Sequence, residues 1–115
     1  MSEFVQVTTT TGTRHDAEQI AAELLSRRLA GCAQVTGPVT STFRWQGKVE
    51  TAEEWMCTVK TSRAQLDAIQ KVFEAIHPYE LPEMIATPIV DGSAAYLQWL
   101  GEQVGSLEQG AGSGE

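Results

Sequence analysis

The residues of this chain best suited to chemistry lie in residues 77–83, His-Pro-Tyr-Glu-Leu-Pro-Glu, where four titratable side chains occupy seven positions. Pro78 cannot continue a helix, and Pro82 favours an extended conformation at Leu81, so the segment is predicted to be a stiff connector. Stiff polar loops on rigid scaffolds often carry function. The alternative is that the prolines only end a helix and the charges face water.

The elements that must position this loop follow from hydrophobic periodicity. Strands are expected at residues 4–10 and 84–90, long extended arms at 32–45 and 48–61, and helices after Thr13, Ser62 and Ser93. The spacing of capping boxes occurs twice, at Thr13 with Asp16 and at Ser62 with Gln65. The apolar stripe of the first expected helix stops at Gly31. This order predicts an α+β, ferredoxin-like fold, βαββαβ plus a C-terminal helix. Residues 1–105 are expected to form one domain, and the Gly- and Ser-rich residues 106–115 a disordered tail.

The two arms around the turn at residues 46–47 are longer than the first strand can match. About 14 residues at roughly 3.3 Å each reach about 46 Å, and the first strand covers about half of that length. This hairpin carries Phe43, Trp45 and Trp55, so we expect its unpaired half to pair with and pack on neighbouring subunits of an oligomer. The alternative is a hairpin that bends back onto its own sheet at residues 37–38.

Composition and charge limit the partners. The 115 residues are 42% hydrophobic and 20% charged, which fits one ordinary globular domain. A net charge of −7 opposes attraction to a nucleic-acid backbone or to an anionic membrane, and cations are the natural counter-charge. The first residues show neither a cationic leader nor a long apolar run. We therefore expect a cytoplasmic protein with reduced thiols.

Five motifs occur in order: CAQV at residues 32–35, STFRWQGKVE at 41–50, VKT at 59–61, HPYELPE at 77–83 and YLQW at 96–99. Together they resemble the CutA family, the divalent-cation tolerance proteins, over about residues 4–104. The resemblance implies a cytosolic homotrimer of ferredoxin-like subunits, similar in architecture to the PII signalling proteins. It also implies a role in tolerance of copper and other divalent metals. Gln34 and Phe43 stand where the family more often has Asn and Tyr.

Thiolate and imidazole are the ligands that copper prefers among the side chains of this sequence. Counting from the turn places Cys57 opposite Thr36, about 13 Å along the hairpin from Cys32, so the two thiols of one subunit share neither a disulfide nor a metal. Cys57 lies in an apolar strand and is expected to be a small core side chain. The expected ligands of copper or another divalent metal are Cys32, a position that the resemblance supports, and His77, contributed by two subunits. A purely structural role for Cys32 stays open.

A second hypothesis is a PII-like signalling trimer whose intersubunit clefts hold an anionic metabolite or a loop of a partner protein. The residues expected to line these clefts are Arg44, Trp45, Lys60, Tyr79, Glu80 and Glu83. Lys60 would attract the anion and the aromatic rings would stack on it. The alternative is that Lys60 forms an ion pair with Glu80 or Glu83 at an interface.

Two further expectations concern catalysis and the acidic residues of the second arm. The sequence has neither a nucleophile elbow nor a triad pattern, so catalysis with His77 as the base is not expected. Glu53 and Glu54 occupy adjacent strand positions and face opposite sides. Together with Glu50 they are expected to form a solvated surface.

Overall fold

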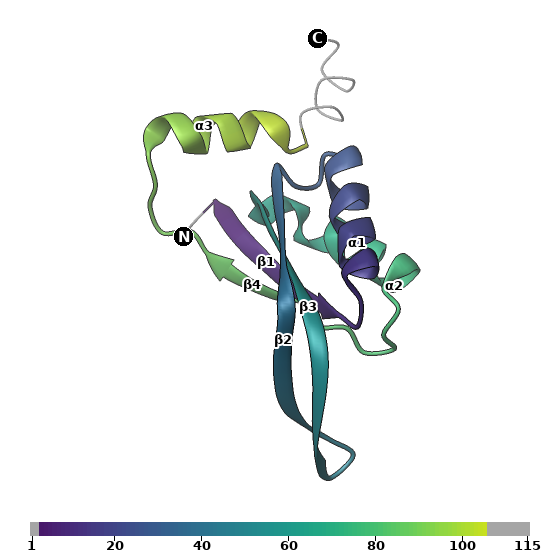
Figure 1. Ribbon diagram of the computed structural model, residues 1–115. Coiled ribbons are helices and arrows are strands. Elements are labelled where there is room, and N and C mark those ends of the chain that lie inside the picture. The colour runs from purple at the N-terminus through teal and green to yellow at the C-terminus, as the bar shows by residue number, and fades with distance from the viewer. Residues whose placement is uncertain (1–2, 106–115) are drawn as a thin grey trace.

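The computed structural model describes residues 3–105 and contains one four-stranded antiparallel sheet and three α-helices (Figure 1). The elements are β1 (Phe4–Thr11), α1 (Arg14–Ser26), β2 (Cys32–Trp45), β3 (Lys48–Ser62), a short 3-10 turn (Arg63–Gln65), α2 (Leu66–Ile76), β4 (Ile85–Pro88) and α3 (Ala94–Gln103). The α+β, ferredoxin-like order predicted from the sequence is confirmed. The expected tail at 106–115 lies outside the described residues.

The strands lie in the order β2-β3-β1-β4, so β1 and β3 are central and the other two form the edges. Helices α1 and α2 cover one face, and α3 crosses one end of the sheet (Figure 1). The core lies between the sheet and these two helices, and its fully buried side chains include Val5, Val7, Val59, Ile20, Leu24 and Ile69. Val5 and Val7, two positions apart in β1, contribute to the sheet side of this core because alternate strand residues share a face.

The starts of two helices follow the sequence prediction. Thr13 Oγ1 accepts the Asp16 N–H at 3.1 Å, and Ser93 Oγ accepts the Tyr96 N–H at 3.2 Å. Both hydroxyls satisfy a backbone donor that the first helical turn leaves without a partner.

The predicted capping box at Ser62 and Gln65 is wrong. The Ser62 side chain makes no capping hydrogen bond, and the chain enters α2 through the 3-10 turn. The end of the first helix also differs, because α1 stops at Ser26 and not at Gly31. Arg28 then adopts a left-handed conformation with φ of 59°, which turns the chain toward β2.

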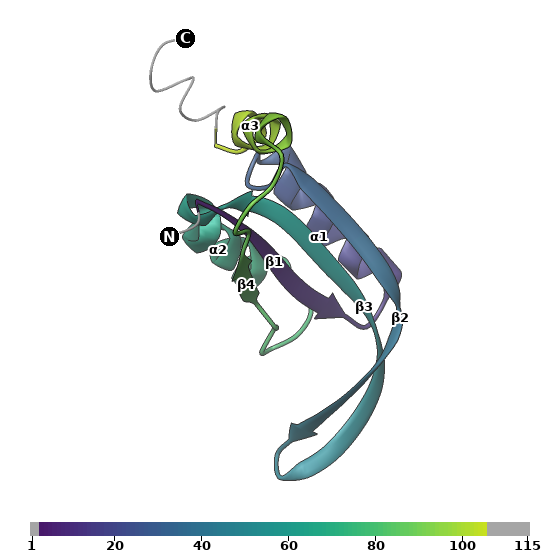
Figure 2. The ribbon, with the colours of Figure 1, turned by 90° about the vertical axis from the view of Figure 1, so that its left-hand side faces the viewer.

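The β2–β3 hairpin extends well past the rest of the sheet. The last residue of β1 pairs with Trp55, so residues 48–54 of β3 pair with β2 alone. This overhang accounts for the 52 Å length of the subunit. The hairpin does not fold back on its own sheet at residues 37–38, because pairing resumes at Val39 and continues to Trp45 in a curved ribbon (Figure 2).

The register of the hairpin shifts by one residue between Thr36 and Val39. A Cβ atom at Gly37 would lie 2.6 Å from the Trp55 ring, so only glycine fits this irregularity without movement. The shift places Cys57 opposite Val35 and not opposite Thr36 as predicted. Cys32 pairs with Lys60, three ladder positions away, which corresponds to about 10 Å.

Within residues 3–105, no helix is long and apolar enough to cross a membrane.

Candidate functional site

His77 ends α2 and is held at both ring nitrogens. Its backbone N–H donates to the Phe73 carbonyl at 2.9 Å, and its Nδ1 accepts the Tyr79 N–H at 3.1 Å. Since Nδ1 is an acceptor, the proton of the neutral ring is on Nε2, which donates to Thr9 Oγ1 at 2.9 Å. Burial lowers the pKa of His77 below the usual 6.5, opposed by the Thr10 backbone and by nearby carboxylates. The described subunit therefore favours a neutral imidazole that fixes the start of the 77–83 loop.

Tyr79 joins this loop to the hairpin. Its hydroxyl donates to Glu54 Oε2 at 2.7 Å, and Glu54 is only 8% exposed. Burial, the hydrogen bond and the charge of Glu54 raise the pKa of Tyr79 to about 12. Burial and the same carboxylate raise the pKa of Glu83. The expected solvated surface is thus wrong at Glu54, which is buried against the loop.

The contact between loop and hairpin encloses a large open groove, which we call the hairpin groove. Its volume is about 1000 Å³. The lining residues are Thr10, Ser41, Thr42, Phe43, Trp45, Glu50, Glu54, Pro78, Tyr79, Glu80, Leu81, Pro82 and Glu83. The groove exists because the hairpin curves toward the side on which β4 and the loop before it lie (Figure 2).

The groove brings together four of the six residues predicted for a cleft, namely Trp45, Tyr79, Glu80 and Glu83. Arg44 alternates with the groove-lining Phe43 and Trp45 along β2, which places it on the other face of the hairpin. Among the described residues, the groove lining holds four glutamates and no lysine or arginine. In one subunit this groove therefore favours a positive ligand over an anion.

Lys60 lies away from the groove, on the sheet face that α1 and α2 leave uncovered. Its Nζ donates to Gln34 Oε1 at 3.1 Å, and its neighbours across the sheet are Cys32 and Gln6. The described ion pairs are Arg14–Glu18 and Arg27–Glu23, so within this subunit Lys60 is joined to an amide and not to Glu80 or Glu83.

The two thiols have different surroundings, and both are free. Burial raises the pKa of Cys57 to about 11, as expected for a core cysteine. Cys32 is half-buried at the start of the edge strand β2, and its proximity to Tyr96 on α3, after burial, contributes to raising the pKa of that tyrosine. Cys32 is thus the more accessible of the two thiols.

The structure does not bring Cys32 and His77 together in one subunit. His77 is bonded to Thr9, which pairs with Cys57, whereas Cys32 pairs with Lys60. Among residues 3–105, no group of three or more His, Cys, Asp or Glu side chains is arranged to hold a metal ion. A closed metal site from the residues of a single described subunit does not fit this geometry.

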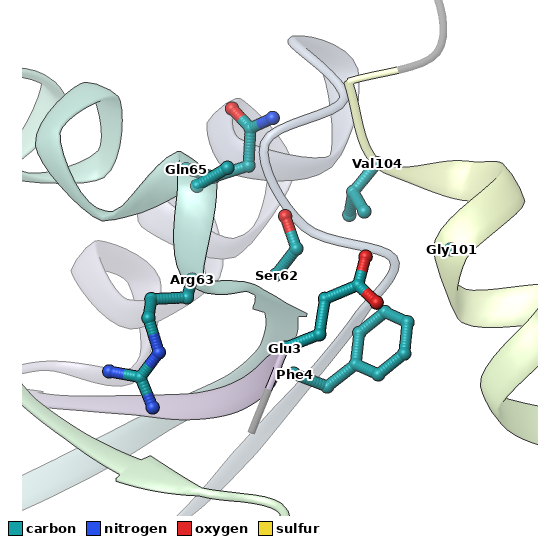
Figure 3. Close-up of a pocket in the computed structure, with 8 residues that line it drawn as sticks. Glu3, Phe4, Ser62, Arg63, Gln65, Gly101 and Val104 are labelled. Carbon is teal, nitrogen blue, oxygen red and sulfur yellow. The ribbon is translucent and has the colours of Figure 1, made fainter. Parts of the chain in front are cut away.

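A second, smaller cavity lies near the opposite end of the sheet, between α3, the start of β1 and the end of β3 (Figure 3). Its volume is about 450 Å³, and it is lined by Glu3, Phe4, Ser62, Arg63, Ala64, Gln65, Gly101 and Val104. We call it the Ser62 pocket.

Sequence reasoning missed Thr9, Glu54 and Ser62 as parts of these sites. Thr9 and Glu54 meet the loop only through contacts 68 and 25 residues apart in sequence. One signal was present for Glu54, which is a carboxylate directly before the largely apolar stretch of residues 55–59.

Comparison with known proteins decides the family. The model of the family described as CutA1 divalent ion tolerance protein matches residues 5–103. The chain belongs to the CutA1 family. This family is named for tolerance of divalent ions and not for a reaction, and the resemblance inferred from the five sequence motifs is confirmed.

Relatives of this CutA1 chain come from bacteria, plants and animals. The divalent-cation tolerance protein CutA of Thermus thermophilus is 39% identical over 89 residues, which cover 77% of this chain and 86% of that protein. Human protein CutA is 36% identical over 84 residues, 73% of this chain. The match spans only 47% of the human protein. It spans 54% of a relative from rice, which is named protein CutA 1, chloroplastic.

Solved CutA1 structures share the fold. The structure of the Thermus thermophilus protein has a TM-score of 0.87 and 36% identity, covering 89% of this chain and 99% of its own. CutA1 from Shewanella sp. SIB1, described as a stable protein, has a TM-score of 0.86 and 33% identity, covering 90% of this chain and 97% of its own.

Proposed function

We propose that this CutA1 protein acts in divalent-metal tolerance as a cytoplasmic homotrimer without catalytic activity. Family membership supports the link to divalent cations. The overhanging hairpin supports the oligomer, and it is the observation on which the proposal chiefly rests. Residues 48–54 have β2 as their sole partner strand in the subunit, and a two-stranded ribbon is marginal in water.

The apolar surface of the subunit agrees with this assembly. Several large apolar side chains are exposed, including Phe43, Trp45 and Val49 on the hairpin, Ile85 on β4, Val90 after it and Trp99 on α3. Exposed large apolar side chains in such numbers are typical of an interface. Neighbouring subunits that cover the hairpin would bury these side chains and supply partners for the overhang.

For the metal, we propose copper or another divalent ion bound by Cys32 and His77 from different subunits. The half-buried Cys32 thiol is the softest accessible ligand in the described chain. His77 binds a metal through Nε2 only after its hydrogen bond to Thr9 is broken. This requirement predicts that Cys32 contributes more to affinity than His77 does.

Native mass spectrometry of the reduced protein, with and without added Cu(I) or Cu(II), tests subunit number and metal uptake together. We expect a trimer that takes up copper in multiples of three, with uptake lost in Cys32→Ser and weakened in His77→Gln. Cys57→Ala is the matched control and keeps full uptake, because its thiol is in the core. A monomer would contradict the assembly, and a trimer without copper would contradict direct metal binding.

The second candidate function is a PII-like signalling trimer, favoured by the meeting of Trp45, Tyr79, Glu80 and Glu83 in the hairpin groove. The groove glutamates favour a basic partner loop, whereas an anionic metabolite would need Arg44 or Lys60 from another subunit. A variant that keeps Trp45 as its only tryptophan reports binding by fluorescence. Quenching by an oligolysine peptide supports a partner loop, and quenching by ATP supports the metabolite. Fluorescence that neither probe changes would contradict this function.

A further inference from the structure

The hairpin groove carries negative charge on two sides. Glu50 and Glu54 line it from β3, and Glu80 and Glu83 line it from the loop before β4. Among the described residues, no lysine or arginine joins this lining. The Glu54 carboxylate accepts the Tyr79 hydroxyl, and burial together with the charge of Glu54 raises the pKa of Glu83. The groove therefore holds an excess of negative charge that a cationic ligand would neutralise.

These carboxylates are spread along the groove. Glu50 and Glu54 share one face of β3, and four residues of strand span about 13 Å. Within residues 3–105, no group of three or more His, Cys, Asp or Glu side chains is arranged to hold a metal ion. A single inorganic cation cannot contact carboxylates at this spacing, because its bonds to oxygen are only about 2.0–2.6 Å long. The spacing favours a ligand whose positive charges are also spread out.

Aromatic side chains line the groove beside these charges. Phe43 pairs with Glu50 across the hairpin, and Trp45 lies two residues further along the same face of β2. Phe43 is 41% exposed and Trp45 is 43% exposed, so both rings offer apolar surface to a ligand. Aromatic rings pack against hydrocarbon chains and attract ammonium groups through cation–π contacts. Lys48 pairs with Trp45 at the tip and does not line the groove, so the acidic stretch ends there.

We infer that the hairpin groove binds a linear polyamine, which rests on the second candidate function because it names the ligand of the same groove. The ammonium groups of the polyamine pair with Glu50, Glu80 and Glu83, and its methylene chain covers Phe43 and Trp45. An extended polyamine spans a distance comparable with that between Glu50 and Glu54. The volume of about 1000 Å³ accommodates such a molecule.

The test is an NMR titration of the full chain, in its native oligomeric state, with spermidine as the probe. We expect the indole N–H signal of Trp45 to shift and saturate. The signal of Trp99, which lies on α3 outside the groove, should stay in place. Hexaamminecobalt(III) is the matched ligand, because it carries the charge of protonated spermidine in a compact ion without a hydrocarbon chain. It is expected to bind at least about fivefold more weakly than spermidine.

Variants separate the charge of the groove from the net charge of the chain. Glu50→Gln and Glu80→Gln each remove an exposed carboxylate from the lining, and each is expected to weaken spermidine binding about twofold to fivefold. Glu53→Gln is the matched control, because Glu53 is exposed on the other face of β3 and the change removes the same charge. Spermidine binding should be unchanged in this control.

Any of three results would overturn the inference. They are an absence of a saturable shift at Trp45 with spermidine, equal binding of hexaamminecobalt(III), and equal weakening by Glu50→Gln and Glu53→Gln. The second candidate function can fail separately. A groove that binds oligolysine but not spermidine would overturn the polyamine and keep the partner loop. A groove that responds to none of spermidine, oligolysine and ATP would contradict both proposals.

Discussion

Replacing Tyr79 by phenylalanine should measure how strongly the 77–83 loop holds the hairpin. The change removes a 2.7 Å hydrogen bond to Glu54, a carboxylate that is only 8% exposed. Hydrogen bonds to charged groups contribute about 1.5–3 kcal/mol, and the open groove lets water reach part of the site. We therefore expect Tyr79→Phe to lower the free energy of unfolding by about 2 kcal/mol.

The assay is guanidinium unfolding with all proteins at one subunit concentration, because association contributes to stability. Tyr96→Phe is the matched control: its hydroxyl contacts the Cys32 thiol on an exposed part of the surface, so the expected loss is under about 0.5 kcal/mol. A double-mutant cycle with Glu54→Gln should show coupling of at least about 1 kcal/mol. A Tyr79→Phe protein as stable as wild type, or an additive cycle, would refute this reasoning.

The same contact predicts a pH dependence at the alkaline end. The pKa of Tyr79 is raised from 10.0 to about 12 in the folded protein. Between these values the unfolded chain loses the phenolic proton while the folded chain keeps it, so stability falls as the pH rises through this range. Tyr79→Phe should reduce this fall but not abolish it, because the pKa values of Cys57 and Tyr96 are also raised in the folded protein.

Three other predictions concern His77, the thiols and the core. The pKa of His77 is lowered below 6.5 in the folded protein, so the imidazole of the unfolded chain is protonated first as the pH falls. The free energy of unfolding should therefore decrease as the pH drops below about 6.5, and His77→Gln should reduce this decrease. Urea unfolding at several pH values measures it. With its pKa raised to about 11, Cys57 should resist iodoacetamide at pH 8 while Cys32 reacts, as followed by mass spectrometry, and equal rates would contradict the burial of Cys57. Leu24→Ala, at a fully buried position, should cost about 2–5 kcal/mol of unfolding free energy, whereas Leu81→Ala, at a 71% exposed position, should cost under about 0.5 kcal/mol.

Local patterns were sufficient to predict the elements of the fold. The alternation of β1, the caps at Thr13 and Ser93 and the turn after Trp45 each depend on residues close in sequence. Each of these signals involves residues only a few positions apart, so the same local interactions form in the folded structure. The length mismatch between the hairpin and β1 also followed from counting residues.

The candidate site was predicted only in part because its contacts are distant in sequence. Periodicity put Trp45 and Tyr79 on separate elements, and only the curvature of the hairpin brings them to one groove. Strand twist and curvature accumulate over many residues, so no single residue type predicts them. The same curvature carries Glu54 against Tyr79, where the alternation rule predicted exposure to water.

The strand order has a consequence for how the chain folds. The β2–β3 hairpin joins neighbouring segments, whereas the β1–β3 pairing closes a loop of 50 residues between Thr8 and Thr58. Hairpins of neighbouring strands form quickly, whereas pairings that close a long loop form later because closure costs more conformational entropy. During synthesis β1 and α1 emerge earlier, but the hairpin should therefore be the first pair of strands to form, with its apolar outer half exposed. The last strand to arrive, β4, then covers the open edge of β1 and completes the sheet.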